Sequence, residues 1–127
     1  MIRFGLVLGI LLAACGGDGG GVAPQQACDD IASATCERLY ACFQPAELAT
    51  AGYPASEAAC VTMMQAANGC PAQTTQNACT GNAVYQPAKA AECSDQITGL
   101  ACSQVRDPFF DIKTAAPTCA EVCLTPT

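Results

Sequence analysis

Cysteine is the residue type that most constrains what this chain can fold into. The 127 residues contain eleven cysteines, and Cys15 lies at the end of an apolar N-terminal segment. The remaining ten are Cys28, Cys36, Cys42, Cys60, Cys70, Cys79, Cys93, Cys102, Cys119 and Cys123. An even set in a short exported chain predicts a disulfide framework, here of about five bridges. Such bridges stabilise a domain of about 100 residues whose large apolar side chains are few.

The first residues have the order of a secretory signal. Arg3 supplies one positive charge, the run from Phe4 to Ala14 is apolar except for glycine, and Cys15 follows two alanines. This order predicts a signal peptide at residues 1–14. The apolar run is shorter than the roughly 20 residues needed to cross a bilayer.

The end of this segment, Leu12-Ala13-Ala14-Cys15, resembles the bacterial lipobox, the motif cut by lipoprotein signal peptidase. The resemblance implies a diacylglyceryl thioether on Cys15, cleavage before it and an acyl group on the new α-amine. Several acyl chains anchor a protein stably, whereas a single chain binds only marginally. The alternative is an ordinary signal peptide that happens to be followed by a cysteine.

Residues 15–27 follow as the lipidated cysteine and a glycine-rich stretch, which predicts a flexible tether. In enteric bacteria an aspartate directly after the lipidated cysteine retains a lipoprotein in the inner membrane, and Gly16 stands there instead. The expected location is therefore the outer membrane, on its periplasmic or cell-surface face, with the membrane as a partner through the lipid anchor.

The cysteine spacing disfavours metal and redox sites. No two cysteines show the Cys-x2-Cys spacing that zinc sites and dithiol motifs use. The nearest pair, Cys119 and Cys123, is interpreted as two half-cystines. We expect no metal and no cofactor.

Hydrophobic periodicity predicts a mainly α fold for residues 28–127: a small disulfide-rich helical domain with three or more short helices. In the helix predicted over 28–43, Cys28, Cys36 and Cys42 share the apolar face. Cys28 and Cys36 would lie roughly 12 Å apart along the axis, too far to pair with each other. Further helices are expected after Ser56 up to Gly69, over about 87–97, and as a short turn over 117–123. Residues 71–81 are expected to form a loop.

Composition disfavours catalysis and nucleic acid. Histidine is absent, which excludes a Ser-His-Asp triad, a Cys-His dyad and an HExxH zinc site. From Cys15 onward, four basic residues stand against eleven acidic ones, a net charge of −7. This charge disfavours binding to nucleic acid.

The run CDDIASATCERLYAC, the later Cys-x9-Cys spacing and the terminal PTCAEVC are similar to small Cys-rich lipoproteins of myxobacteria and their relatives. The resemblance implies the class and location of the protein. It supplies no catalytic residue.

The expected function is that of a membrane-anchored lipoprotein with a non-enzymatic extracytoplasmic interaction domain, which could bind a protein partner. The candidate binding patch is Phe109, Phe110 and Ile112, because exposed apolar clusters mark binding sites. The alternative is that these side chains fill a thin core. Two other functions stay open: a carrier of a small apolar ligand or lipid, with Met63 and Met64 in its cavity, and an inhibitor of a secreted hydrolase that presents the loop 71–81.

Overall fold

The computed structural model describes residues 21–127, so the predicted signal peptide, the lipidation site Cys15 and most of the predicted tether lie outside the described residues. The described chain is mainly helical, as predicted. Its elements are α1 (Pro24–Cys42), α2 (Pro45–Thr50), α3 (Glu57–Ala67), the 3-10 turn η2 (Cys70–Ala72), β1 (Val84–Tyr85), α4 (Pro87–Thr98), α5 (Cys102–Val105), α6 (Ile112–Ala115), the 3-10 turn η3 (Pro117–Glu121) and β2 (Cys123–Leu124).

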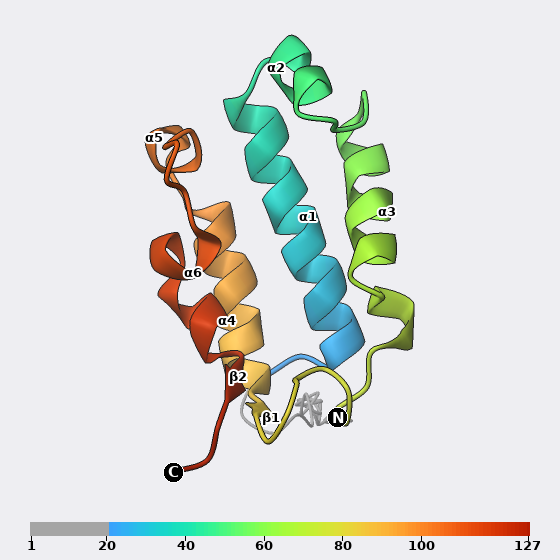
Figure 1. Cartoon of the computed structure of the whole chain (residues 1–127), viewed down its shortest axis with the longest axis vertical. Coiled ribbons are helices and arrows are strands. Elements are labelled where there is room, and N and C mark those ends of the chain that lie inside the picture. The colour runs from blue at the N-terminus through green and yellow to red at the C-terminus, as the bar shows by residue number, and fades with distance from the viewer. Residues whose placement is uncertain (1–20) are drawn as a thin grey trace, which may run out of the picture.

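The long helix α1 is the centre of the fold (Figure 1). It packs against α4 on one side and against α3 on the other, so that the three helices form one layer. The helix α2 closes one end of this layer, and α5 lies on the other side of the end of α1. The short ladder of β1 and β2 lies at the opposite end, where α1 begins.

The folded domain begins earlier than predicted. Pro24 stands in the first turn of α1, where its fixed φ and missing N–H suit a helix start, so Pro24–Ala27 are helical and do not belong to the tether. Before the helix, the Val22 N–H donates to the Pro87 carbonyl at 3.3 Å, and the Tyr85 hydroxyl donates to the Val22 carbonyl at 2.7 Å. The boundary placed at Cys28 is therefore wrong, and the chain is held from Val22 onward.

All ten predicted half-cystines are paired, and the five bridges confirm the expected framework. The pairs are Cys28–Cys70, Cys36–Cys60, Cys42–Cys102, Cys79–Cys123 and Cys93–Cys119. Cys28 and Cys36 pair with separate partners, as their spacing along the helix requires. Three of the bridges start on α1, so this helix is covalently joined to the chain on both of its sides.

The core is built from small side chains. Its buried members are mostly alanine and cysteine, and Ile97 is the largest side chain that is fully buried. Around it lie Ala34, Cys93 and Ala116, with Ile112 packed against them. Small side chains let the helices approach closely, and the disulfides then hold them there.

Most helix ends follow local signals. The Ser56 hydroxyl accepts from the Ala59 N–H at 3.2 Å and caps α3. Gly69, with φ of 63°, adopts the left-handed conformation after that helix. The helix α6 and the antiparallel pairing of Tyr85 with Cys123 are additions that the sequence did not predict. Within residues 21–127, none of the helices is both long and apolar enough to cross a membrane.

Candidate functional site

Most of the aromatic residues within 21–127 belong to the end of α1 and to the connections that follow α2 and α5. These segments lie toward one end of the molecule (Figure 1). Of the aromatic residues within 21–127, one, Tyr85, is buried near the opposite end. The others are all partly or largely exposed, and we call them the aromatic pole: Tyr40, Phe43, Tyr53, Phe109 and Phe110. Because aromatic side chains usually dominate cores and interfaces, their partial or full exposure makes this end the candidate site.

An apolar groove runs across the pole between the end of α1 and α2. Its volume is about 430 Å³, within the range of ligand pockets. The lining residues are Tyr40, Phe43, Pro45, Ala46, Leu48, Ala49, Tyr53, Pro54 and Ala55. The Tyr40 hydroxyl donates to the Pro54 carbonyl, which ties the connection after α2 to α1 and forms one wall of the groove.

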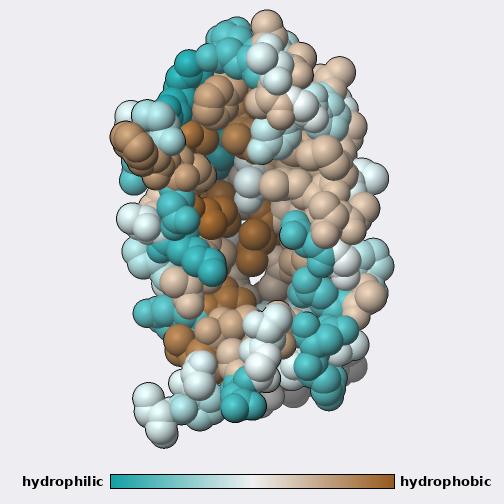
Figure 2. Space-filling model, viewed as in Figure 1, coloured by the Kyte–Doolittle hydropathy of each residue, from teal (hydrophilic) through white to brown (hydrophobic). Residues whose placement is uncertain are grey.

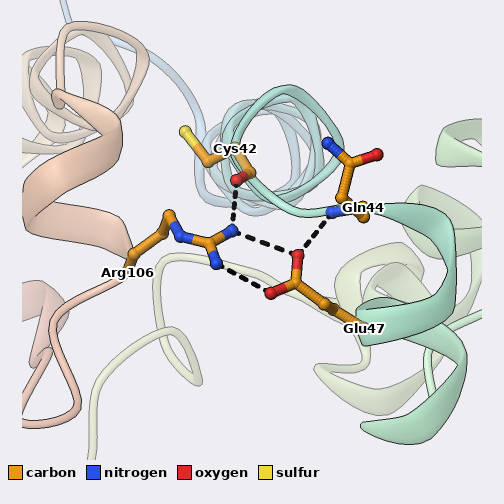
Figure 3. A network of polar contacts seen from close by, with 4 residues as sticks. All are labelled: Cys42, Gln44, Glu47 and Arg106. Carbon is orange, nitrogen blue, oxygen red and sulfur yellow. Dashed lines mark hydrogen bonds and ion pairs between the residues drawn. The ribbon is translucent and has the colours of Figure 1, made fainter.

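A polar network fixes the position of these elements (Figure 3). Arg106 pairs with Glu47 through two contacts, at 2.7 and 3.1 Å, and donates to the Cys42 carbonyl at 2.8 Å. Glu47 also accepts from the Gln44 N–H at 2.7 Å at the start of α2. The guanidinium carbon of Arg106 lies 4.8 Å from the Phe43 ring centroid, a cation–π contact.

This network sets the charge state of its carboxylate. The hydrogen bonds from Arg106, and then from the Gln44 backbone, lower the pKa of Glu47 to about 2. The same pairing raises the pKa of the Arg106 guanidinium. The two charges therefore satisfy each other, and the network positions Phe43 and the end of α5 without leaving a free charge at the groove.

The connection between α5 and α6 presents the other two aromatics. The Asp107 carboxylate accepts from the Phe109 N–H at 2.8 Å, and the Asp107 carbonyl accepts from the Phe110 N–H at 2.9 Å. On this hydrogen-bonded turn Phe109 is 91% exposed and Phe110 is 37% exposed. Ile112, the third member of the predicted patch, packs against the core cluster around Ile97 and does not belong to this surface.

The other candidate residues are spread over the molecule. Met63 is 39% exposed, and the Met64 sulfur lies 3.4 Å from the Cys36 sulfur in a packing contact. Neither lines the groove. The loop 71–81 follows Cys70 and contains Cys79, and its turn is held by the Thr74 N–H donating to the Asn77 side chain at 2.6 Å.

A second apolar hollow lies over the first half of α1. Figure 2 shows this hollow with hydrophobic surface at its floor. It consists of two adjoining pockets of about 480 and 240 Å³, which share Ile31, Asn68, Ala78 and Val122. Among the described residues, histidine, cysteine and carboxylate side chains form no group of three or more that could hold a metal ion.

Sequence reasoning identifies Phe109 and Phe110 but misses the groove. It gives Tyr40 and Tyr53 no role. Phe43 is half-buried: it packs against the cluster of Cys42, Leu100 and Val105 and also lines the groove. The available signal is local: Tyr40 and Phe43 come just before Pro45, and Tyr53 stands directly before Pro54. Pro45 begins α2 and Pro54 follows it, so each proline marks a change of chain direction beside these aromatic residues.

No protein-family model matches the chain, and comparisons with curated proteins and with solved structures gave no significant match. The functional assignment therefore depends on the geometry and the sequence features of the chain itself.

Proposed function

We propose that this protein is an exported lipoprotein, anchored through Cys15, whose aromatic pole binds a protein partner and catalyses no reaction. The observation that carries the proposal is the aromatic pole itself: five aromatic side chains on a disulfide-linked scaffold, all of them at least partly exposed. Aromatic residues contribute most of the binding energy at many protein interfaces, because they bury a large area with few rotatable bonds.

The position of the pole supports this proposal. The chain enters the domain at the start of α1, and the pole lies at the other end of that helix. Its 19 residues place the two ends about 28 Å apart. An anchor on the N-terminal side would therefore leave the aromatic pole facing away from the membrane.

The charge around the pole favours a protein partner over a lipid surface. Asp107 and Asp111 flank the two phenylalanines in the sequence, and the whole chain has a formal net charge of −6. Anionic lipid headgroups repel such a surface. The five disulfides, for their part, are typical of an oxidising extracytoplasmic compartment.

The anchor is tested by the intact mass of the protein extracted from the membrane fraction of a bacterial host. We expect a mass that begins at Cys15 and is increased by acyl chains, and no acylation of a Cys15→Ser variant. An unmodified mass that begins elsewhere would refute the lipoprotein assignment.

The binding surface is tested by photo-crosslinking in cells, with a benzophenone amino acid at position 109. The matched control carries it at position 84, because Val84 is 49% exposed at the opposite end of the domain. We expect a light-dependent adduct with a protein from position 109 and none from position 84. Adducts of equal yield from both positions, or from neither, would contradict a partner at the aromatic pole.

A second candidate function is the transport of a small apolar ligand, which the hollow over α1 favours. Its larger pocket, of about 480 Å³, is lined by Ile31, Cys93, Ile112 and Val122 among others. Native mass spectrometry of protein purified without detergent tests it. A bound lipid that an Ile31→Trp variant excludes would favour the carrier, and a ligand-free wild-type protein would count against it.

A further inference from the structure

Arg38 is a cation placed against a disulfide. Its Nη2 atom lies 3.3 Å from the Cys42 sulfur and 3.6 Å from the Cys102 sulfur. Its Nε atom is buried and has no hydrogen-bond partner. Within residues 21–127 the ion pairs involve Lys89 and Arg106, and none includes Arg38. The hydrogen-bond partners of this half-buried guanidinium are therefore the two sulfur atoms of one disulfide.

A positive charge beside a sulfur atom favours the thiolate, which is both the nucleophile and the leaving group of thiol–disulfide exchange. The neutral disulfide gains little from the same charge. Arg38 therefore stabilises the reduced form of the Cys42–Cys102 pair relative to the oxidised form.

Two of the other bridges, Cys36–Cys60 and Cys79–Cys123, have different surroundings. Cys36 and Cys60 are both completely buried, so a reductant cannot reach their sulfurs. Cys79 and Cys123 are partly exposed, but their sulfurs lie 3.9 and 3.7 Å from the carbonyl oxygens of Val122 and Ala78. Carbonyl oxygens disfavour a thiolate, so this bridge is an accessible comparator with the opposite electrostatics.

The Cys42–Cys102 bridge joins the end of α1 to the start of α5. Non-covalent contacts also hold these two elements together. Arg106, at the end of α5, donates to the Cys42 carbonyl at 2.8 Å and pairs with Glu47. Cys102 itself is partly exposed at the start of α5. The bridge can therefore be reached and opened while α1 and α5 remain in contact.

From these observations we infer that Cys42–Cys102 is a redox-active disulfide, which a dithiol reductant opens before Cys36–Cys60 and Cys79–Cys123, and that Arg38 is the positioning residue that makes it so. The thiolate of the reductant bonds to the Cys102 sulfur, the Cys42–Cys102 bond breaks, and Cys42 takes the electron pair as a thiolate beside Arg38. The second thiol of the reductant, after losing its proton to water, attacks the first sulfur of the reductant and releases Cys102 as a thiolate. The reductant leaves as its disulfide, and the protein has gained two electrons.

This inference does not depend on the proposed function, although it adds to it. Cys42 precedes Phe43, and Cys102 begins the helix that leads to Phe109. The redox-active bridge thus joins the two chain segments that form the aromatic pole.

The first experiment treats the oxidised protein with limiting dithiothreitol, quenches with acid, alkylates the free thiols and maps the labelled peptides. We expect Cys42 and Cys102 to be labelled at least tenfold faster than Cys79 and Cys123. Labelling of Cys79 and Cys123 at the same rate or earlier would overturn the inference.

The second experiment tests Arg38. We expect Arg38→Gln, which removes the charge, to slow the opening of Cys42–Cys102 by about tenfold, and Arg38→Lys, which keeps the charge, to restore most of the rate. Lys89→Gln removes an equal charge at the opposite end of the domain and should leave the rate unchanged. If Arg38→Gln is folded by circular dichroism and opens at the wild-type rate, the role of Arg38 is refuted. If Arg38→Gln does not fold, the test uses Arg38→Lys. The role of Arg38 is then refuted if Cys42–Cys102 opens no faster than Cys79–Cys123 in that variant.

Discussion

Phe109 and Phe110 are neighbours in sequence, yet their exposure predicts very different effects of truncation. Complete burial of a phenylalanine side chain contributes up to about 3 kcal/mol. Phe109 is 91% exposed, so Phe109→Ala should lower the free energy of unfolding by about 0.3 kcal/mol. Phe110 is 37% exposed, and Phe110→Ala should therefore lower it by about 2 kcal/mol.

The measurement is guanidinium chloride unfolding without reductant, followed by far-UV circular dichroism and analysed by linear extrapolation. Leu48→Ala is the matched control, since Leu48 is only 4% exposed at the same end of the molecule and its truncation should remove about 3 kcal/mol. A loss above about 1 kcal/mol for Phe109→Ala would show that this ring packs in the folded protein. The assignment of Phe109 to a binding surface would then be wrong, and the thin-core interpretation would replace it.

Three further perturbations test other parts of the structure. Ile97→Ala removes the largest fully buried side chain and should lower the free energy of unfolding by about 3 kcal/mol in the same assay. Gly21→Ala should lower the melting temperature, because a Cβ atom there would lie 2.2 Å from the Pro87 Cβ, whereas at Gly99 the nearest atoms lie at 3.6 Å and the same substitution should be tolerated. Glu47 has its pKa lowered from 4.5 to about 2, so its pairing with Arg106 stabilises the fold fully above pH 4.5 and is lost as the pH falls toward 2. Melting temperatures across this range should fall less in Glu47→Gln than in the wild type, and parallel curves would contradict the pairing.

Local signals predict much of the helical framework. Pro45, Ser56 and Gly69 each act within a few residues, through a fixed φ, a side-chain cap and a left-handed φ, so their effect can be read without knowledge of the fold. The parity of the cysteines likewise predicts about five bridges. Their pairing cannot be predicted in this way, because it depends on which helices pack side by side.

The errors arise where a local pattern has two physical meanings. The glycine-rich segment predicts flexibility, yet Gly21 is a glycine because the chain passes too close to Pro87 for a side chain. A two-residue strand such as Val84–Tyr85 is too short to show a periodic pattern. The groove of the aromatic pole depends on the hydrogen bond from Tyr40 to the Pro54 carbonyl. This contact joins α1 to an irregular connection, and hydrophobic periodicity predicts only regular elements.

The small core and the exposed aromatic pole have the same physical cause: disulfides supply much of the stability of this domain. A core of alanine and cysteine around Ile97 buries little apolar area, so burial alone would leave a domain of this size marginal. Each disulfide adds about 2–4 kcal/mol, largely by restricting the unfolded chain, and this contribution does not require large buried side chains. Apart from Tyr85, the aromatic residues within 21–127 then do not have to be fully buried. Because covalent bonds hold α1, α3 and α5 in place, the end of the molecule can carry exposed rings that a domain stabilised by burial alone would have to place inside.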